Sequence, residues 1–89
     1  MTGITRTRHN TITAHAAHLI TQAGGITHLD SLSAQARKPA LVSLSHALAD
    51  NESITYETAR RHIARACRRA RHPDYQPPAW GGDHTRPKP

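Results

Sequence analysis

The sequence predicts an all-α fold, a small bundle of three or four helices. Apolar residues recur at helical spacing in several stretches, no stretch alternates as a β-strand does, and glycine or proline separates the stretches. With 89 residues and no phenylalanine, the chain allows one small domain with a thin core of Ile, Leu and Ala. Dimerisation would add buried surface to such a domain, so a homodimer is one expectation.

We expect three regions along the chain. Residues 1–9 carry basic side chains among threonine and glycine and predict a flexible basic arm. Residues 10–72 hold the helical periodicity and form the domain. Residues 73–89 are rich in proline and glycine, which is typical of an extended tail without regular structure.

The first predicted helix covers residues 10–23, with Asn10 or Thr11 as its N-terminal cap. Its apolar stripe is followed by Gly24-Gly25, which should end it, and Ile26 is placed for the apolar contact that often follows a glycine cap.

Residues 27–37 are less regular. Asp30 and Ser31 are the candidate caps of a short helix there, which would hold Leu32 and Ala36.

A further helix is predicted to begin at Pro39 and to extend to Ala49. Proline suits the first turn of a helix, and Lys38 before it is biased away from helical geometry. One continuous helix with a kink at Pro39 is the alternative. Asp50-Asn51 should end this helix, because asparagine tolerates the left-handed cap conformation.

The most informative stretch covers residues 54–71, where apolar residues fall on one side of a helical wheel. That side holds Tyr56, Ala59, Ile63, Ala66, Cys67 and Ala70. The opposite side and its flanks hold Glu57, Arg60, Arg61, Ala64, Arg65, Arg68 and Arg71. So many arginines with few carboxylates repel one another unless a polyanion lies opposite them. The pattern favours a helix that binds nucleic acid, and a solvated basic face is the alternative.

The spacing Ile54-Thr55-x-x-Thr58-Ala59-x-Arg61-x-Ile63 resembles the second half of a helix-turn-helix DNA-binding motif. The preceding Leu44, Ala47 and Leu48 are spaced as a supporting helix requires, so the resemblance covers about residues 40–66. The connection from Ala49 to Ser53 departs from the motif, because it is longer than the usual turn of three or four residues.

The resemblance implies that the helix over residues 55–71 lies in the major groove of double-stranded DNA, with Thr55 as its cap. Residues that would contact base edges are Tyr56, Glu57, Arg60, Arg61 and Ala64. Residues that would contact phosphates are Thr55, Thr58, Arg65, Arg68, Arg69 and Arg71, joined by Arg6 and Arg8 of the arm. The domain at residues 10–72 would then be the DNA-binding domain of a small cytoplasmic transcriptional regulator from a bacterium, a phage or a mobile element.

Two other functions stay open at this point. The same arginine-rich helix suits an RNA-binding protein, and it also suits an interaction module that assembles with or inhibits a larger nucleoprotein complex. In the second case Tyr75 and Trp80 of the tail would bind a protein partner. The other interpretations are that these two aromatic side chains pack on the thin core, or that the tail is disordered.

The remaining composition narrows the classes of function. The net charge of +6 and the pI near 10.8 favour an acidic partner, and no apolar run is long enough to span a membrane. We expect no enzyme, no cofactor and no catalytic residue, because no nucleophile is placed with a base. His15 and His18 lie one turn apart but lack further ligands, so no metal is expected. Protonated histidines would strengthen DNA binding in acid.

Cys67 is a single cysteine and cannot form an internal disulfide, which suits a reducing compartment. Its place on the apolar side of the helix predicts a small buried residue.

Overall fold

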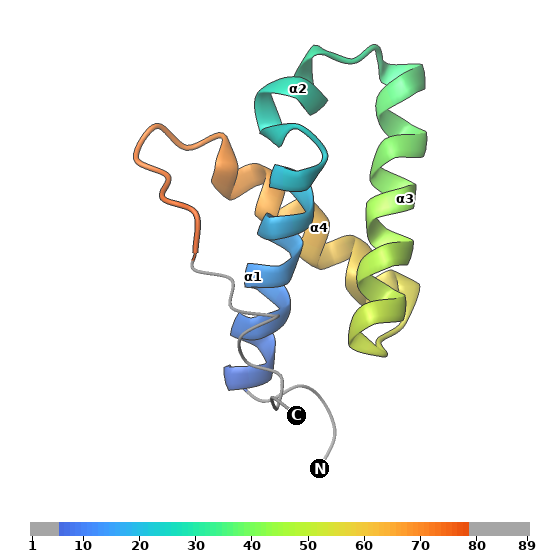
Figure 1. The fold of residues 1–89 in the computed structure, drawn as a ribbon, viewed down its shortest axis with the longest axis vertical. Coiled ribbons are helices and arrows are strands. Elements are labelled where there is room, and N and C mark those ends of the chain that lie inside the picture. The colour runs from blue at the N-terminus through green and yellow to red at the C-terminus, as the bar shows by residue number, and fades with distance from the viewer. Residues whose placement is uncertain (1–5, 79–89) are drawn as a thin grey trace.

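The computed structural model describes residues 6–78. Within this part of the chain it has no strand, and its helices are α1 (Arg6–Gln22), α2 (Gly25–Ser31), α3 (Ala34–Glu52) and α4 (Tyr56–Ala70). α1 and α3 run side by side, α2 connects them at one end, and α4 crosses behind them (Figure 1). The all-α prediction is confirmed.

The core lies where α4 packs against α1 and α3. Its buried members are Ile12, Ala16, Ile20, Leu29, Leu48, Ala49, Ala59, Ile63, Ala66 and Cys67. The predicted apolar stripe of α4 is buried from Ala59 to Cys67, whereas Tyr56 and Ala70 at its two ends are half-buried. Burial of each large aliphatic side chain, such as Ile12 or Leu48, contributes about 1.5–3 kcal/mol, and the core holds few of them.

α1 begins at Arg6 and not at Asn10, so the predicted boundary of a flexible arm at residue 9 is wrong for residues 6–9. Asn10 and Thr11 lie inside the helix, and the Thr11 hydroxyl donates to the Thr7 carbonyl at 3.0 Å instead of capping. The first turn is held because Arg8 donates to Glu52 at the end of α3. The rest of the predicted arm, residues 1–5, lies outside the described residues.

Gly24-Gly25 ends α1 as predicted, with φ of 111° and 87°, backbone angles that favour glycine. α2 starts at once at Gly25, and Ile26 packs against the core. Asp30 and Ser31 do not cap a helix there, because α2 ends at Ser31. The cap is Ser33, whose hydroxyl accepts from the Ala36 N–H at 3.1 Å and starts α3.

α3 runs through Pro39, so the predicted start of a new helix at Pro39 is wrong and the continuous helix is correct. Proline at this position removes the backbone hydrogen bond to the Gln35 carbonyl. Both Gln35 and Pro39 are exposed, so water can satisfy that carbonyl. The helix is favoured overall because its later turns bury Leu48 and Ala49.

α3 also ends later than predicted, at Glu52, and Ser53 (φ 55°) takes the left-handed conformation expected of Asn51. The connection to α4 is therefore residues 53–55, and the long connection inferred from the sequence is wrong. Thr55 caps α4 as predicted: its hydroxyl accepts from the Thr58 N–H at 3.1 Å.

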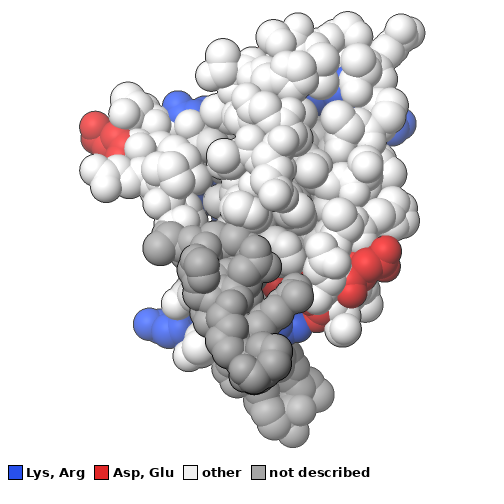
Figure 2. Space-filling model, in the orientation of Figure 1, with Lys and Arg blue, Asp and Glu red and all other residues white. Residues whose placement is uncertain are grey.

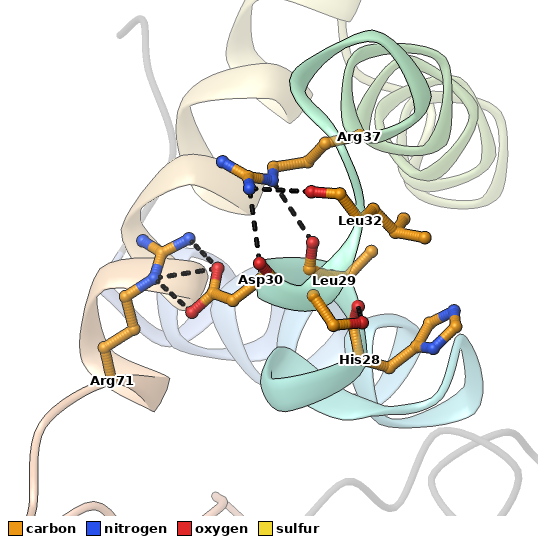
Figure 3. Close-up of polar contacts among 7 residues, drawn as sticks. His28, Leu29, Asp30, Leu32, Arg37 and Arg71 are labelled. Carbon is orange, nitrogen blue, oxygen red and sulfur yellow. Dashed lines mark hydrogen bonds and ion pairs between the residues drawn. The ribbon is translucent and has the colours of Figure 1, made fainter.

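Two arginines attach the short helix α2 to its neighbours (Figure 3). Arg37 of α3 donates to the carbonyl oxygens of Leu29 at 3.2 Å and Leu32 at 2.9 Å, at the C-terminal end of α2. Arg71, after α4, donates from two nitrogens to the Asp30 carboxylate, at 2.8 and 3.0 Å. This hydrogen-bonded ion pair lowers the pKa of Asp30.

The tail has no regular structure up to residue 78, as predicted. Its Tyr75 N–H donates to the His72 carbonyl at 3.0 Å. The Tyr75 side chain is half-buried and lines a hollow together with Thr13 and Ala17 of α1, and its burial raises the pKa of its hydroxyl. The partial burial of Tyr75 shows that this part of the tail is not fully exposed, while Trp80 lies outside the described residues. No helix in the described part is long and apolar enough to cross a membrane.

Candidate nucleic-acid interface

α4 presents a basic face on the side away from the core. Its exposed arginines are Arg60, Arg61, Arg65, Arg68 and Arg69. Glu57 in the first turn is the one acidic residue of this helix. An acid near the N-terminus and arginine in the last turn both complement the helix dipole, so this order of charges stabilises the helix.

Positive charge is distributed unevenly over the molecule. Figure 2 shows the face on which α1 and α3 lie in front of α4, and there Lys and Arg appear mostly at the margins of the described atoms. The chain has twelve Lys and Arg residues, and five of them are the exposed arginines of α4. The basic charge is thus concentrated on one helix.

Four of the five predicted base-contacting residues lie on the outward part of α4. Glu57 and Arg60 form an ion pair at 3.2 Å, with side chains 65% and 52% exposed. Arg61 is exposed, and Ala64 is half-buried between the arginines. Tyr56 differs, because its ring packs against His46 of α3 with ring centroids 4.6 Å apart.

The predicted phosphate-contacting residues divide into two groups. Arg65, Arg68 and Arg69 of α4 are exposed, as is Arg6 of α1. Each of the others has a partner within the protein: Thr55 caps α4 and donates to the Thr58 hydroxyl at 2.9 Å, Arg8 pairs with Glu52, and Arg71 pairs with Asp30. A phosphate contact by Arg8 or Arg71 would be shared with that carboxylate, because a guanidinium has five N–H donors.

The basic face borders two hollows, one on each side of α4. The hollow toward α3, about 450 Å³, has an apolar floor that includes Leu41, Val42 and Ile63, and basic residues at its rim. The hollow toward α1, about 470 Å³, is lined mostly by basic and other polar residues. Its lining residues are His9, Thr58, Arg60, Arg61, His62, Ala64, Arg65 and Arg68.

His62 lies on the buried side of α4, a position that the sequence analysis did not assign to it. Its Nδ1 is 3.2 Å from the Thr13 hydroxyl of α1, and its ring lies against that of His9. Burial lowers the pKa of His62, and the charges of His9 and Arg65 lower it further. The neutral form of His62 is thus favoured in the folded protein. The spacing of His62 from Ala59 and Ala66 is that of the buried stripe.

A buried polar cluster supports the turn that leads into α4. Glu52, 7% exposed, accepts from Arg8 at 2.6 Å and lies 2.5 Å from the Nδ1 of His15. Arg8 also donates to the Glu52 backbone carbonyl. The sequence places Glu52 in the connection from Ala49 to Ser53, and no periodic pattern marks Glu52 or His15 as buried.

The described residues include no group of three or more His, Cys, Asp or Glu side chains that could hold a metal ion. The Nδ1 atom of His15 contacts the Glu52 carboxylate. His15 therefore does not act with His18 as an isolated pair of metal ligands. Cys67 is buried as predicted, and burial raises the pKa of its thiol. This thiol is therefore a packing group and not a reactive thiolate.

Comparisons of the chain with protein-family models, with curated proteins and with solved structures gave no match.

Proposed function

We propose that the protein binds double-stranded DNA through α4 and acts as a small transcriptional regulator. The observation that carries this proposal is the concentration of five exposed arginines on one short helix whose opposite side is buried. A cationic helix of this kind fits the width of the DNA major groove, and arginine is suited both to phosphate and to guanine.

The connection before α4 supports the same proposal. Residues 53–55 separate α3 from α4, which is within the three or four residues usual for a helix-turn-helix. Thr55 fixes the start of α4 by capping it, and Ser53 makes the sharp change of direction. A helix held at its N-terminus by a short turn can present its first two turns to base edges in a defined register.

The position of each exposed residue on α4 indicates whether it would contact bases or phosphates. Arg61 and Arg68 lie most nearly opposite Ala59 and Ile63, which are buried. Arg61 is in the N-terminal half, the part of a recognition helix that meets bases, so we assign it to base contacts together with Glu57 and Arg60. Arg65, Arg68 and Arg69 are assigned to phosphates.

The proposal is tested by fluorescence anisotropy with a duplex selected from a random pool, with random duplex and hairpin RNA as competitors. We expect the selected duplex to be retained against both competitors. If hairpin RNA displaces it at equal concentration, the helix binds RNA instead. If the protein binds neither, the arginine face binds a protein partner and the proposal is wrong.

Two variants test the assigned roles. Arg61→Ala should reduce the preference for the selected duplex over random duplex, because a bidentate base contact contributes about 1–3 kcal/mol of discrimination. Arg68→Ala is the matched control on the same helix and should weaken both duplexes equally. Equal losses on both duplexes for both variants would contradict base contact by Arg61.

A further inference from the structure

The hollow between α1 and α4 has the composition of an anion site. Four of its lining residues are arginines, two are histidines, one is Thr58, and none is acidic. It lies beside the outward face of α4, on the side toward α1. A DNA strand that borders the major groove would pass along this side, and its phosphates are the anions that would meet the hollow.

On α4, Thr58 and Arg65 both line the hollow. Residues seven positions apart lie on one side of a helix, with Arg61 between them. The Thr58 hydroxyl accepts from the Thr55 hydroxyl at 2.9 Å, so its own proton is available to another acceptor. Arg65 is exposed and offers a planar set of N–H groups that matches a phosphate.

His9 is the α1 residue that lines the hollow. Its half-buried ring lies 4.8 Å from that of His62, centroid to centroid. His62 is in turn held by Thr13. The position of His9 is therefore supported by a buried residue, and an imidazole has an N–H to donate in either protonation state.

We infer that His9, Thr58 and Arg65 together bind one backbone phosphate of the nucleic acid. This inference rests on the proposed function and adds a contact from α1, a helix outside the motif that the sequence resembles. Arg8, which the sequence pointed to as a phosphate contact, pairs with Glu52, and His9 takes that role in its place. One phosphate bound by two helices would set the angle at which α4 lies on the duplex.

The first experiment uses inorganic phosphate as the probe, titrated at constant ionic strength and followed by NMR. We expect saturable shifts of the resonances of His9, Thr58 and Arg65, with none at His28, an exposed histidine on α2. Shifts spread equally over all arginines, or none at His9, would overturn the inference. This titration needs no DNA, so it separates failure of the phosphate site from failure of the proposed function.

The second experiment compares duplex affinities of His9→Ala and the control His28→Ala. Loss of one hydrogen bond to phosphate should weaken binding about fivefold, equally on selected and random duplex, and His9→Arg should restore it. Thermal melting checks that each variant is folded, and Arg65→Gln tests the same site from an exposed position. If His9→Ala binds as tightly as His28→Ala, the phosphate contact from α1 is wrong.

Discussion

Glu52 is the residue whose environment differs most from its sequence context. A carboxylate beside Asp50, Asn51 and Ser53 has the composition of an exposed turn, yet the side chain is buried against Arg8 and His15. Its partners come from α1, which is distant in the sequence, so no local pattern could reveal the contact. A buried carboxylate of this kind needs partners, because desolvation of the charge is costly.

We predict that Glu52→Ala lowers the free energy of unfolding by about 2 kcal/mol, because it removes the buried carboxylate that Arg8 and His15 both contact. Urea denaturation measures the change. Glu57→Ala is the control: Glu57 is an exposed glutamate paired with an exposed arginine, and its loss should change stability by less than about 0.5 kcal/mol. Similar losses for both variants would show that the buried cluster stabilises the fold no more than an exposed ion pair does.

His62 gives a prediction for the pH dependence of stability. Its pKa is lowered in the folded protein, first by burial, so the unfolded chain binds a proton more readily. Between the lowered pKa and the ordinary value of 6.5 the unfolded state holds more protons, and stability must rise with pH. We therefore expect stability to fall as the pH drops below 6.5.

Urea denaturation at about pH 5.5 and about pH 7.5 measures this dependence. His62→Gln keeps an amide near the Thr13 hydroxyl and removes the titrating group, so its stability should vary less between the two pH values. An unchanged pH dependence in this variant would assign the effect to another group.

Among the helices, α4 was predicted best from the sequence. The start of α1 was predicted least well. Three features of α4 are local in the sequence: the Thr55 cap, the apolar stripe from Ala59 to Cys67, and the arginine face. Each is found where the sequence predicted it. The boundaries of α1 and α3 were missed because tertiary contacts determine them. Arg8 holds the first turn of α1 and Glu52 the last turn of α3, and the burial of Leu48 outweighs the cost of Pro39.

The cap of α4 gives a prediction at this scale. Thr55→Ala should lower the free energy of unfolding by about 1 kcal/mol, because the Thr58 N–H loses its acceptor at the start of the helix. Thr55→Ser is the matched control, since serine caps as well as threonine does. Thermal or urea unfolding measures both variants. Equal stability of the alanine and serine variants would mean that the cap does not hold α4 in place.

For the whole molecule, the helical periodicity predicted an all-α chain and the composition predicted a thin core, and the described residues have both features. The packing of α4 against both α1 and α3 could not be read from the sequence, because apolar stripes do not specify which helix each one faces. The same limit applies to the interface. Its arginines were found from spacing, whereas the approach of His9 to α4 depends on the crossing of two helices.

The salt dependence of duplex binding tests the central claim, that α4 is a DNA-binding helix, most directly. The three exposed arginines assigned to phosphates, Arg65, Arg68 and Arg69, predict a slope of about −2.7 for log affinity against log salt concentration. The double variant Arg65→Gln, Arg69→Gln should reduce the slope to about −0.9. A slope near zero, or one that the double variant leaves unchanged, would contradict DNA binding by this face.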